Sequence, residues 1–170
     1  MKINRILVPV DYSPGSLQAL KYAADLAKPL GAELLALAVV EPILFVVPDY
    51  AGAQSSTLAE LINEQRRAAR AELARLERRY AKRGVRLRPL VLIGRPSTAI
   101  NETATRLKAD LIIMATHGRT GVSRLLMGSV TERVVRTATC PVLTLRTDAR
   151  PRRAAARRRR NPRRAAASAG

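Results

Sequence analysis

The sequence predicts a three-layer α/β domain in which helices cover both faces of a doubly wound, five-stranded parallel sheet. Strand-like and helix-like segments alternate along the chain from Ile3 to Arg146, a pattern typical of parallel sheets with right-handed crossovers. The strand-like segments are continuously apolar, as expected when both faces of a sheet are covered. We expect the strand order 3-2-1-4-5, with the first and fourth strands adjacent where the order reverses.

The elements follow from their start and stop signals. Ser13-Pro14 has the form of a helix N-cap followed by proline at the first helical position, and Gly31 ends the same helix. Prolines and a glycine mark residues 41–54 as a loop. Strands are expected over 3–10, 32–40, 85–92, 110–115 and 141–146, and helices over 14–30, 55–84, 97–107 and 128–138.

The longest helix, over 55–84, is amphipathic. Basic residues dominate one side, and interleaved glutamates can pair with them locally, so we expect this side to be a solvated face. The apolar stripe consists of Leu58, Leu61, Ile62, Ala69, Leu73, Leu76 and Tyr80.

Composition separates a domain from a tail. The chain has 170 residues and a net charge of +18. Residues 147–170 contain nine arginines and one acid, Asp148, which gives +8 and leaves +10 for residues 1–146. The tail contains no Leu, Ile, Val or aromatic residue, so we expect a disordered basic extension after a folded domain over 1–146.

The remaining composition indicates a cytoplasmic protein. No apolar run reaches the roughly 20 residues that a membrane span needs, and the N-terminal residues do not form a signal peptide pattern. Cys140 is the single cysteine, which excludes an internal disulfide. Its position before Pro141, between apolar elements, favours a buried structural thiol over a reactive one.

A glycine-bearing connection carries the strongest functional signal. Met114-Ala115-Thr116-His117-Gly118 follows an apolar strand, and Gly128-Ser129-Val130-Thr131 opens a helix. Glycine lets the backbone approach an anion closely, and the free N–H groups and dipole of a helix start favour negative charge. This connection therefore predicts a phosphate-binding loop, although a plain glycine turn with an ordinary helix start would give the same pattern.

At these residues the chain resembles the universal stress protein family, over essentially all of residues 1–146. The matching segments are ILVPVDYS, AVVEP and MATHGRTGVSRLLMGSVTERVVRTATCPVLTLR. Nucleotide-binding members of this family carry a glycine, two residues, a glycine, nine residues, then a glycine and a small hydroxyl residue. Gly118, Gly128 and Ser129 match this pattern, whereas Ala115 stands at its first glycine.

The resemblance implies a Rossmann-like fold of the adenine nucleotide alpha hydrolase type that binds ATP or a related adenine nucleotide, with Mg²⁺ reaching Asp11 through the nucleotide. It also implies a homodimer formed along the edge strand at 141–146, which an exposed apolar edge favours independently. The implied nucleotide-binding residues are Pro9, Val10 and Asp11 beside adenine and ribose, Val39 at the base, Met114, Ala115, His117, Gly118 and Arg119 along ribose and phosphates, and Gly128, Ser129, Val130 and Thr131 as the donor-bearing helix start.

Several of these residues have a second interpretation. Asp11 fits a helix cap as well as a ligand of nucleotide-bound metal, and His117 fits a packed loop residue as well as a phosphate contact. If position 115 needs a positive φ or a close backbone contact, the methyl group of Ala115 would strain or crowd the site. If that position only ends the strand, alanine fits at little cost.

The leading hypothesis is a dimeric stress-response regulator that binds ATP, with hydrolysis slow at most, because no general base is evident. The alternative is a nucleotide-free scaffold of the same family whose tail, at residues 150–164, binds nucleic acid non-specifically through its charge. A nucleotide hydrolase or transferase rests on fold analogy alone.

Overall fold

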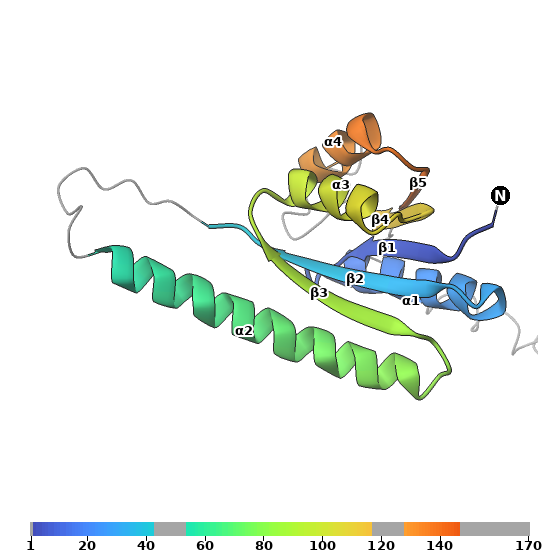
Figure 1. Cartoon of the computed structure of the whole chain (residues 1–170), viewed down its shortest axis with the longest axis horizontal. Coiled ribbons are helices and arrows are strands. Elements are labelled where there is room, and N and C mark those ends of the chain that lie inside the picture. The colour runs from blue at the N-terminus through green and yellow to red at the C-terminus, as the bar shows by residue number, and fades with distance from the viewer. Residues whose placement is uncertain (1, 43–53, 117–127, 147–170) are drawn as a thin grey trace, which may run out of the picture.

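The computed structural model describes residues 2–42, 54–116 and 128–146. All five strands pair in parallel in one sheet of order β3-β2-β1-β4-β5 (Figure 1). The predicted fold class and strand order are confirmed. In chain order the elements are β1 (Arg5–Pro9), α1 (Pro14–Leu30), β2 (Glu33–Val40), α2 (Gln54–Ala81), β3 (Leu87–Ile93), α3 (Pro96–Arg106), β4 (Leu111–Ala115), α4 (Ser129–Thr137) and β5 (Val142–Leu145).

Two helices cover each face of the sheet and divide the core into two parts. Helices α1 and α2 pack on one face, and α3 and α4 lie across the other (Figure 1). Within β1, Ile6 and Val8 enter the core under α1, whereas Leu7 enters the core under α3 and α4. Successive residues of a strand point to opposite faces, so a strand that is buried on both sides reads as continuously apolar.

Helix α1 has the ends that the sequence predicts. The Oγ of Ser13 accepts a hydrogen bond from the N–H of Ser16 at 3.2 Å, and Pro14 occupies the first helical turn. Gly31 ends the helix with a φ of 63°, a left-handed conformation that glycine adopts without steric cost. These two signals fix the direction in which the chain leaves β1 and enters β2.

The apolar stripe predicted for the longest helix is only partly buried in α2. Ala69, Leu73 and Tyr80 are buried against the sheet, but the side chain of Leu61 is 51% exposed. Leu58 and Ile62 beside it are half-buried, so Leu61 is exposed because it lies about 100° around the helix from the buried side. Over the described residues, no helix has both the length and the apolar character needed to cross a bilayer.

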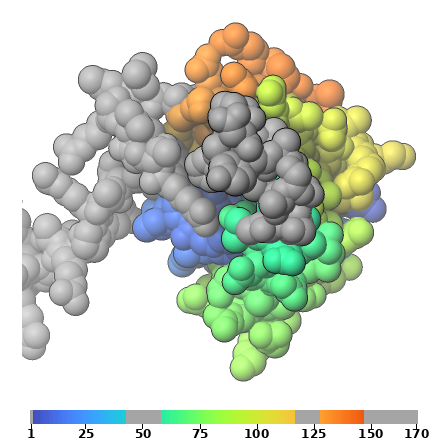
Figure 2. All heavy atoms as spheres, turned by 90° about the vertical axis from the view of Figure 1, so that its left-hand side faces the viewer, coloured from blue at the N-terminus to red at the C-terminus, as the bar shows by residue number. Residues whose placement is uncertain are grey.

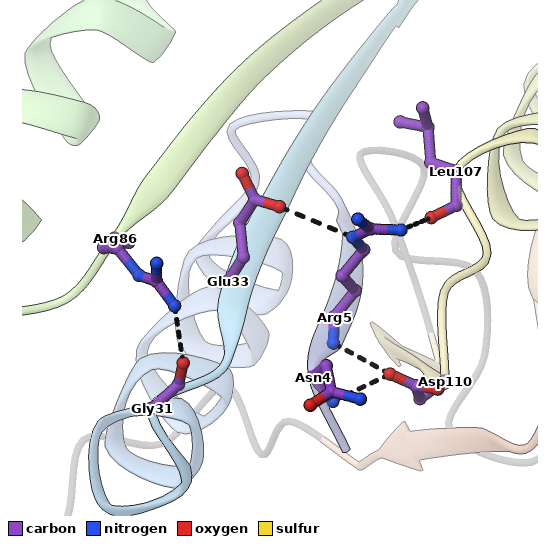
Figure 3. A network of polar contacts seen from close by, with 7 residues as sticks. All are labelled: Asn4, Arg5, Gly31, Glu33, Arg86, Leu107 and Asp110. Carbon is purple, nitrogen blue, oxygen red and sulfur yellow. Dashed lines mark hydrogen bonds and ion pairs between the residues drawn. The ribbon is translucent and has the colours of Figure 1, made fainter. Parts of the chain in front are cut away.

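Side chains close the amino edge of the sheet, where the strands begin (Figure 3). The Oδ2 of Asp110 accepts hydrogen bonds from the backbone N–H groups of Asn4, at 2.7 Å, and Arg5, at 2.9 Å. Arg5 donates to the carbonyl of Leu107 at the end of α3, and Arg86 donates to the carbonyl of Gly31 at the end of α1. Each arginine therefore satisfies a carbonyl at a helix C-terminus and places positive charge at the negative end of the helix dipole.

Candidate functional site

The carboxyl ends of β1 and β4 form the point at which the chain changes face. These strands are neighbours, with Leu7 opposite Ile112, but β1 leads into α1 on one face and β4 leads into α4 on the other. In doubly wound sheets, ligands bind beyond the carboxyl ends of the strands at such a point. Figure 2 views the molecule from this side, with α4 (orange) at the top and α2 (green) at the bottom.

The turn after β1 is held by short hydrogen bonds. The Oδ1 of Asp11 accepts from the N–H of Ser13 at 3.0 Å and from its hydroxyl at 2.6 Å. The hydroxyl of Ser16 donates to the Ser13 carbonyl and accepts from the N–H of Asp11. Ser13 is thus the cap of α1, and Asp11 orients that cap. Asp11 therefore does not cap the helix itself, and its role toward a metal stays a prediction.

Tyr12 is a residue of this turn that the sequence analysis missed. Its φ is 65°, a left-handed conformation that costs a non-glycine residue about 1 kcal/mol. Its hydroxyl donates to the carbonyl of Ala69 in α2 at 2.9 Å. This contact spans 57 residues of sequence, and tyrosine is not a usual residue for a left-handed position, so no local pattern predicts it. Tyr12 fixes the position of its neighbour Asp11 relative to α2.

Hydrogen bonds join the two ends of the connection between β4 and α4. The N–H of Gly128 donates to the carbonyl of Thr116 at 2.8 Å, and the buried hydroxyl of Thr131 donates to the carbonyl of Ala115 at 3.0 Å. The N–H of Thr116 donates a hydrogen bond to the carbonyl of Leu145 in β5 at 3.0 Å. The start of α4 is therefore fixed against the end of β4, and the Thr131 hydroxyl is used within the protein.

The first turn of α4 presents backbone donors. Its first internal hydrogen bond joins the N–H of Glu132 to the carbonyl of Gly128 at 2.9 Å, so the amides of Ser129, Val130 and Thr131 precede the helical ladder. No side chain of the described residues caps this helix start. Ser129 is exposed, whereas Val130 is half-buried and Thr131 is buried. Three amides and the positive end of the helix dipole are the features that bind an anion.

The backbone at two positions of the pattern is ordinary. Gly128 has φ −60° and ψ 145°, values that any residue adopts. Ala115 lies within β4, opposite Leu145, and has no positive φ. Because side chains alternate along a strand, the methyl group of Ala115 points to the same face as Ile113, the face covered by α1. Alanine at this position therefore causes no backbone strain, and its methyl group does not point toward α4.

The structure gathers the other described candidates at the same edge. Val10 and Met114 are buried, so any contact that they make with a ligand goes through their backbone. Pro9 and Val39 are half-buried at the ends of β1 and β2. His117, Gly118 and Arg119 lie outside the described residues, as does the tail at 147–170. Their predicted roles stay predictions.

Two further observations concern chemistry at this domain. Cys140 is half-buried, and burial, followed by the charge of Asp110, raises the pKa of its thiol above the ordinary value. A raised pKa lowers the thiolate fraction at neutral pH, which agrees with a structural role. Across the described ranges, no three His, Cys, Asp or Glu side chains come together in a metal-binding arrangement.

Comparisons with known proteins agree with the family resemblance and the fold. The chain matches the universal stress protein family over residues 2–146. A universal stress protein of Methanocaldococcus jannaschii is 38% identical over 143 residues, which cover 84% of this chain and 82% of the relative. One from Thermus aquaticus is 39% identical over 141 residues, which cover 83% of this chain and 97% of the relative.

Solved structures give the same result. Universal stress protein UspA from Lactobacillus plantarum superposes with a TM-score of 0.77 at 28% identity, covering 86% of this chain and 99% of that one. A universal stress protein in complex with cAMP has a TM-score of 0.64 at 22% identity, covering 87% of this chain and 100% of the other. One from Archaeoglobus fulgidus in complex with dAMP has a TM-score of 0.56 at 20% identity, covering 85% and 98%. The chain belongs to the universal stress protein family.

Proposed function

We propose that this universal stress protein binds ATP or a related adenine nucleotide at the carboxyl edge of its sheet and acts as a dimeric stress-response regulator. The observation that carries the proposal is the start of α4, where the amides of Ser129, Val130 and Thr131 precede the helical ladder and no described side chain caps them. Relatives of the same fold bind cAMP and dAMP, two adenine nucleotides. The proposal extends that chemistry to this chain.

In the proposed complex the phosphates lie at the first turn of α4. The amides of Ser129 and Val130 donate to phosphate oxygens, since both precede the first helical hydrogen bond. Pro9, Asp11 and Val39 border the adenine and ribose from the ends of β1 and β2, and Asp11 lies beside nucleotide-bound Mg²⁺. His117, Gly118 and Arg119 complete the phosphate loop in this proposal.

Titration of the full-length protein with ATP and Mg²⁺ by calorimetry tests the site. We expect Ser129→Asp to weaken ATP binding by about tenfold or more, because a carboxylate at the helix start repels the phosphates. Ser129→Asn is the matched control, since it has the same shape without the charge, and should retain most of the affinity. Ser129 is exposed, and aspartate is favourable in a first helical turn, so both variants should fold.

Position 129 gives a sharper test than Gly128→Ala, because the φ and ψ of Gly128 suit alanine. Titration with GTP checks the adenine preference. Equal affinities of the wild type, Ser129→Asp and Ser129→Asn for ATP would contradict the phosphate position, and the absence of any binding heat with the wild type would contradict nucleotide binding itself.

The proposed dimer uses β5. This strand is the last in the sheet order, and all four of its residues are only half-buried. An edge strand presents unpaired backbone groups that a second copy can satisfy. Sedimentation velocity should show a dimer for the wild type and for Thr144→Val, whereas Thr144→Lys should dissociate it by placing like charges at the shared edge. A wild-type monomer at micromolar concentration would contradict this assembly.

The alternative, a nucleotide-free scaffold, rests on composition. The nine arginines of residues 147–170 are accompanied by one acid, so the tail cannot neutralise itself and attracts polyanions. The tail is not needed for the nucleotide proposal. Variants of Ser129 therefore test nucleotide binding, and neutralising the nine arginines of the tail tests the alternative.

A further inference from the structure

A second concentration of positive charge lies within the folded domain, on α2 and the segment that follows it. Residues 66–88 contain ten basic side chains and only two acids, Glu72 and Glu77. This segment of 23 residues therefore carries +8 of the +10 that belongs to residues 1–146. The surplus charge of the domain is thus local rather than spread over its surface.

The acids of α2 do not neutralise this charge as the sequence analysis expected. Within the described part of the chain, Arg75 pairs with Glu72 at 2.6 Å, and Arg83 pairs with Asp25 at 3.7 Å. Between residues 67 and 82, five other basic side chains are exposed and form no ion pair with any described residue. We call these five the α2 basic surface: Arg67, Arg70, Arg78, Arg79 and Lys82.

The shape of this surface is a rod. Residues 67–82 span about 22 Å at the helical rise of 1.5 Å per residue. The opposite side of the same helix is buried, since Ala69, Leu73 and Tyr80 pack against the sheet. Four of the five cations therefore lie on the side of α2 that faces away from the sheet, and Lys82 directly follows the helix.

We propose that the α2 basic surface binds double-stranded nucleic acid through its phosphates, without reading the base sequence. A linear array of cations fits a linear polyanion, and four of the five are arginines, whose guanidinium groups bind phosphate through two parallel hydrogen bonds. Binding depends on charge, releases counterions and weakens steeply with salt.

The same surface fits other polyanion partners less well. The aromatic residue in this part of α2, Tyr80, is 5% exposed, so it offers no ring for the stacking that single strands require. The apolar side of the helix at 67–82 faces the sheet, so it cannot insert into a lipid bilayer as an interfacial helix does. Duplex phosphates remain as the favoured partner.

The position of α2 leaves this surface accessible in the proposed complexes. Helix α2 packs on β3 and β2, and β3 is the edge strand at the other end of the sheet order from β5. A dimer formed through β5 would present one α2 basic surface at each of its ends. The surface also lies on the face of the sheet opposite α4, so nucleotide binding does not cover it.

The test measures duplex binding in the full-length chain after the tail has been neutralised. All nine arginines of residues 147–170 are changed to glutamine, which removes the tail charge without shortening the protein. In this background, fluorescence anisotropy follows binding to a labelled mixed-sequence duplex of about 25 base pairs, from about 50 to 200 mM salt. The triple variant R67Q/R70Q/R78Q is compared with R95Q/R106Q/R133Q, which removes three exposed arginines outside α2.

We expect the α2 variant to weaken binding by about tenfold or more at low salt and to reduce the salt slope by about 2 to 3, or 0.9 for each lost phosphate contact. The control variant should stay within about threefold of its parent, because both variants lose the same net charge. Glutamine is a good helix former, and circular dichroism checks that α2 is retained.

Three results would overturn the proposal. Equal weakening by both triple variants would assign binding to the overall charge. Absence of duplex binding in the tail-neutral protein would assign it to residues 147–170. Tighter binding to vesicles of anionic phospholipid than to the duplex would assign the surface to a membrane.

Discussion

The sheet is closed in different ways at the two ends of its strands, here called the amino edge and the carboxyl edge. At the amino edge, side chains from distant parts of the sequence complete the hydrogen bonding, with Asp110 joined to the start of β1 and Arg5 joined to the end of α3 (Figure 3). At the carboxyl edge, the hydrogen bonds between β4 and α4 join backbone groups and one buried hydroxyl, that of Thr131. The amino edge is thus closed by side chains, and the carboxyl edge carries the backbone groups of the candidate site.

The polarity of the helices explains this difference. Helix C-termini gather at the amino edge, where arginines satisfy their carbonyl groups. Helix N-termini gather at the carboxyl edge, and Ser13 caps α1 there, whereas no side chain of the described residues caps α3 or α4. Of these two uncapped helices, α4 follows β4, the strand at which the order reverses. This combination makes the start of α4 the candidate anion site of the proposed function.

The largest effect on stability is expected at the amino edge. Asp110→Ala removes the acceptor of two backbone N–H groups and should lower the free energy of unfolding by about 2 kcal/mol, as measured by urea denaturation. Asp110→Asn retains one acceptor oxygen and should cost about half as much. If the two edges have separate roles, both variants should bind ATP as the wild type does.

Two outcomes would contradict separate roles for the amino and carboxyl edges. A loss of ATP affinity in Asp110→Asn, at a temperature where the variant is fully folded, would mean that the amino edge contributes to the site. Equal stability of Asp110→Ala and the wild type would mean that the network in Figure 3 is not needed to hold β1.

The sequence predicts those features that depend on nearby residues. Continuous apolar strands, the Ser13-Pro14 start and the Gly31 end led to the correct fold and strand order. The glycine pattern located the connection between β4 and α4. The contact from Asp110 to Asn4 joins residues 106 positions apart, and no local pattern encodes it. The apolar stripe of α2 was predicted too wide, because Leu61 lies about 100° around the helix from the buried side and is exposed.

The candidate site was predicted as a set of positions rather than as an arrangement of atoms. Spacing identified Ser129 and Thr131, but only the structure shows that the Thr131 hydroxyl bonds the Ala115 carbonyl while Ser129 is exposed. The backbone conformation at position 115 is a second example. The sequence left two conformations open, and the strand pairing of Ala115 with Leu145 selects the extended one.

The smallest expected effect, and the sharpest test of the carboxyl edge, is at Ala115. Ala115→Gly restores the glycine of the family pattern. The side chain is 7% exposed and belongs to a strand, so its loss should lower the free energy of unfolding by about 0.5 to 1 kcal/mol. Because the methyl group points to the α1 face, the dissociation constant for ATP should change by less than about threefold, or about 0.7 kcal/mol.

Ala36→Gly in β2 is the matched control for this change. Ala36 is fully buried on the α1 face, where its methyl group is remote from the proposed phosphates. Both glycine variants should lose stability to a similar extent and bind ATP equally. A tenfold gain in affinity with Ala115→Gly, absent from Ala36→Gly, would mean that the methyl group at 115 crowds the nucleotide. The substitution at the first glycine would then set the affinity of this chain, and the start of α4 alone would not.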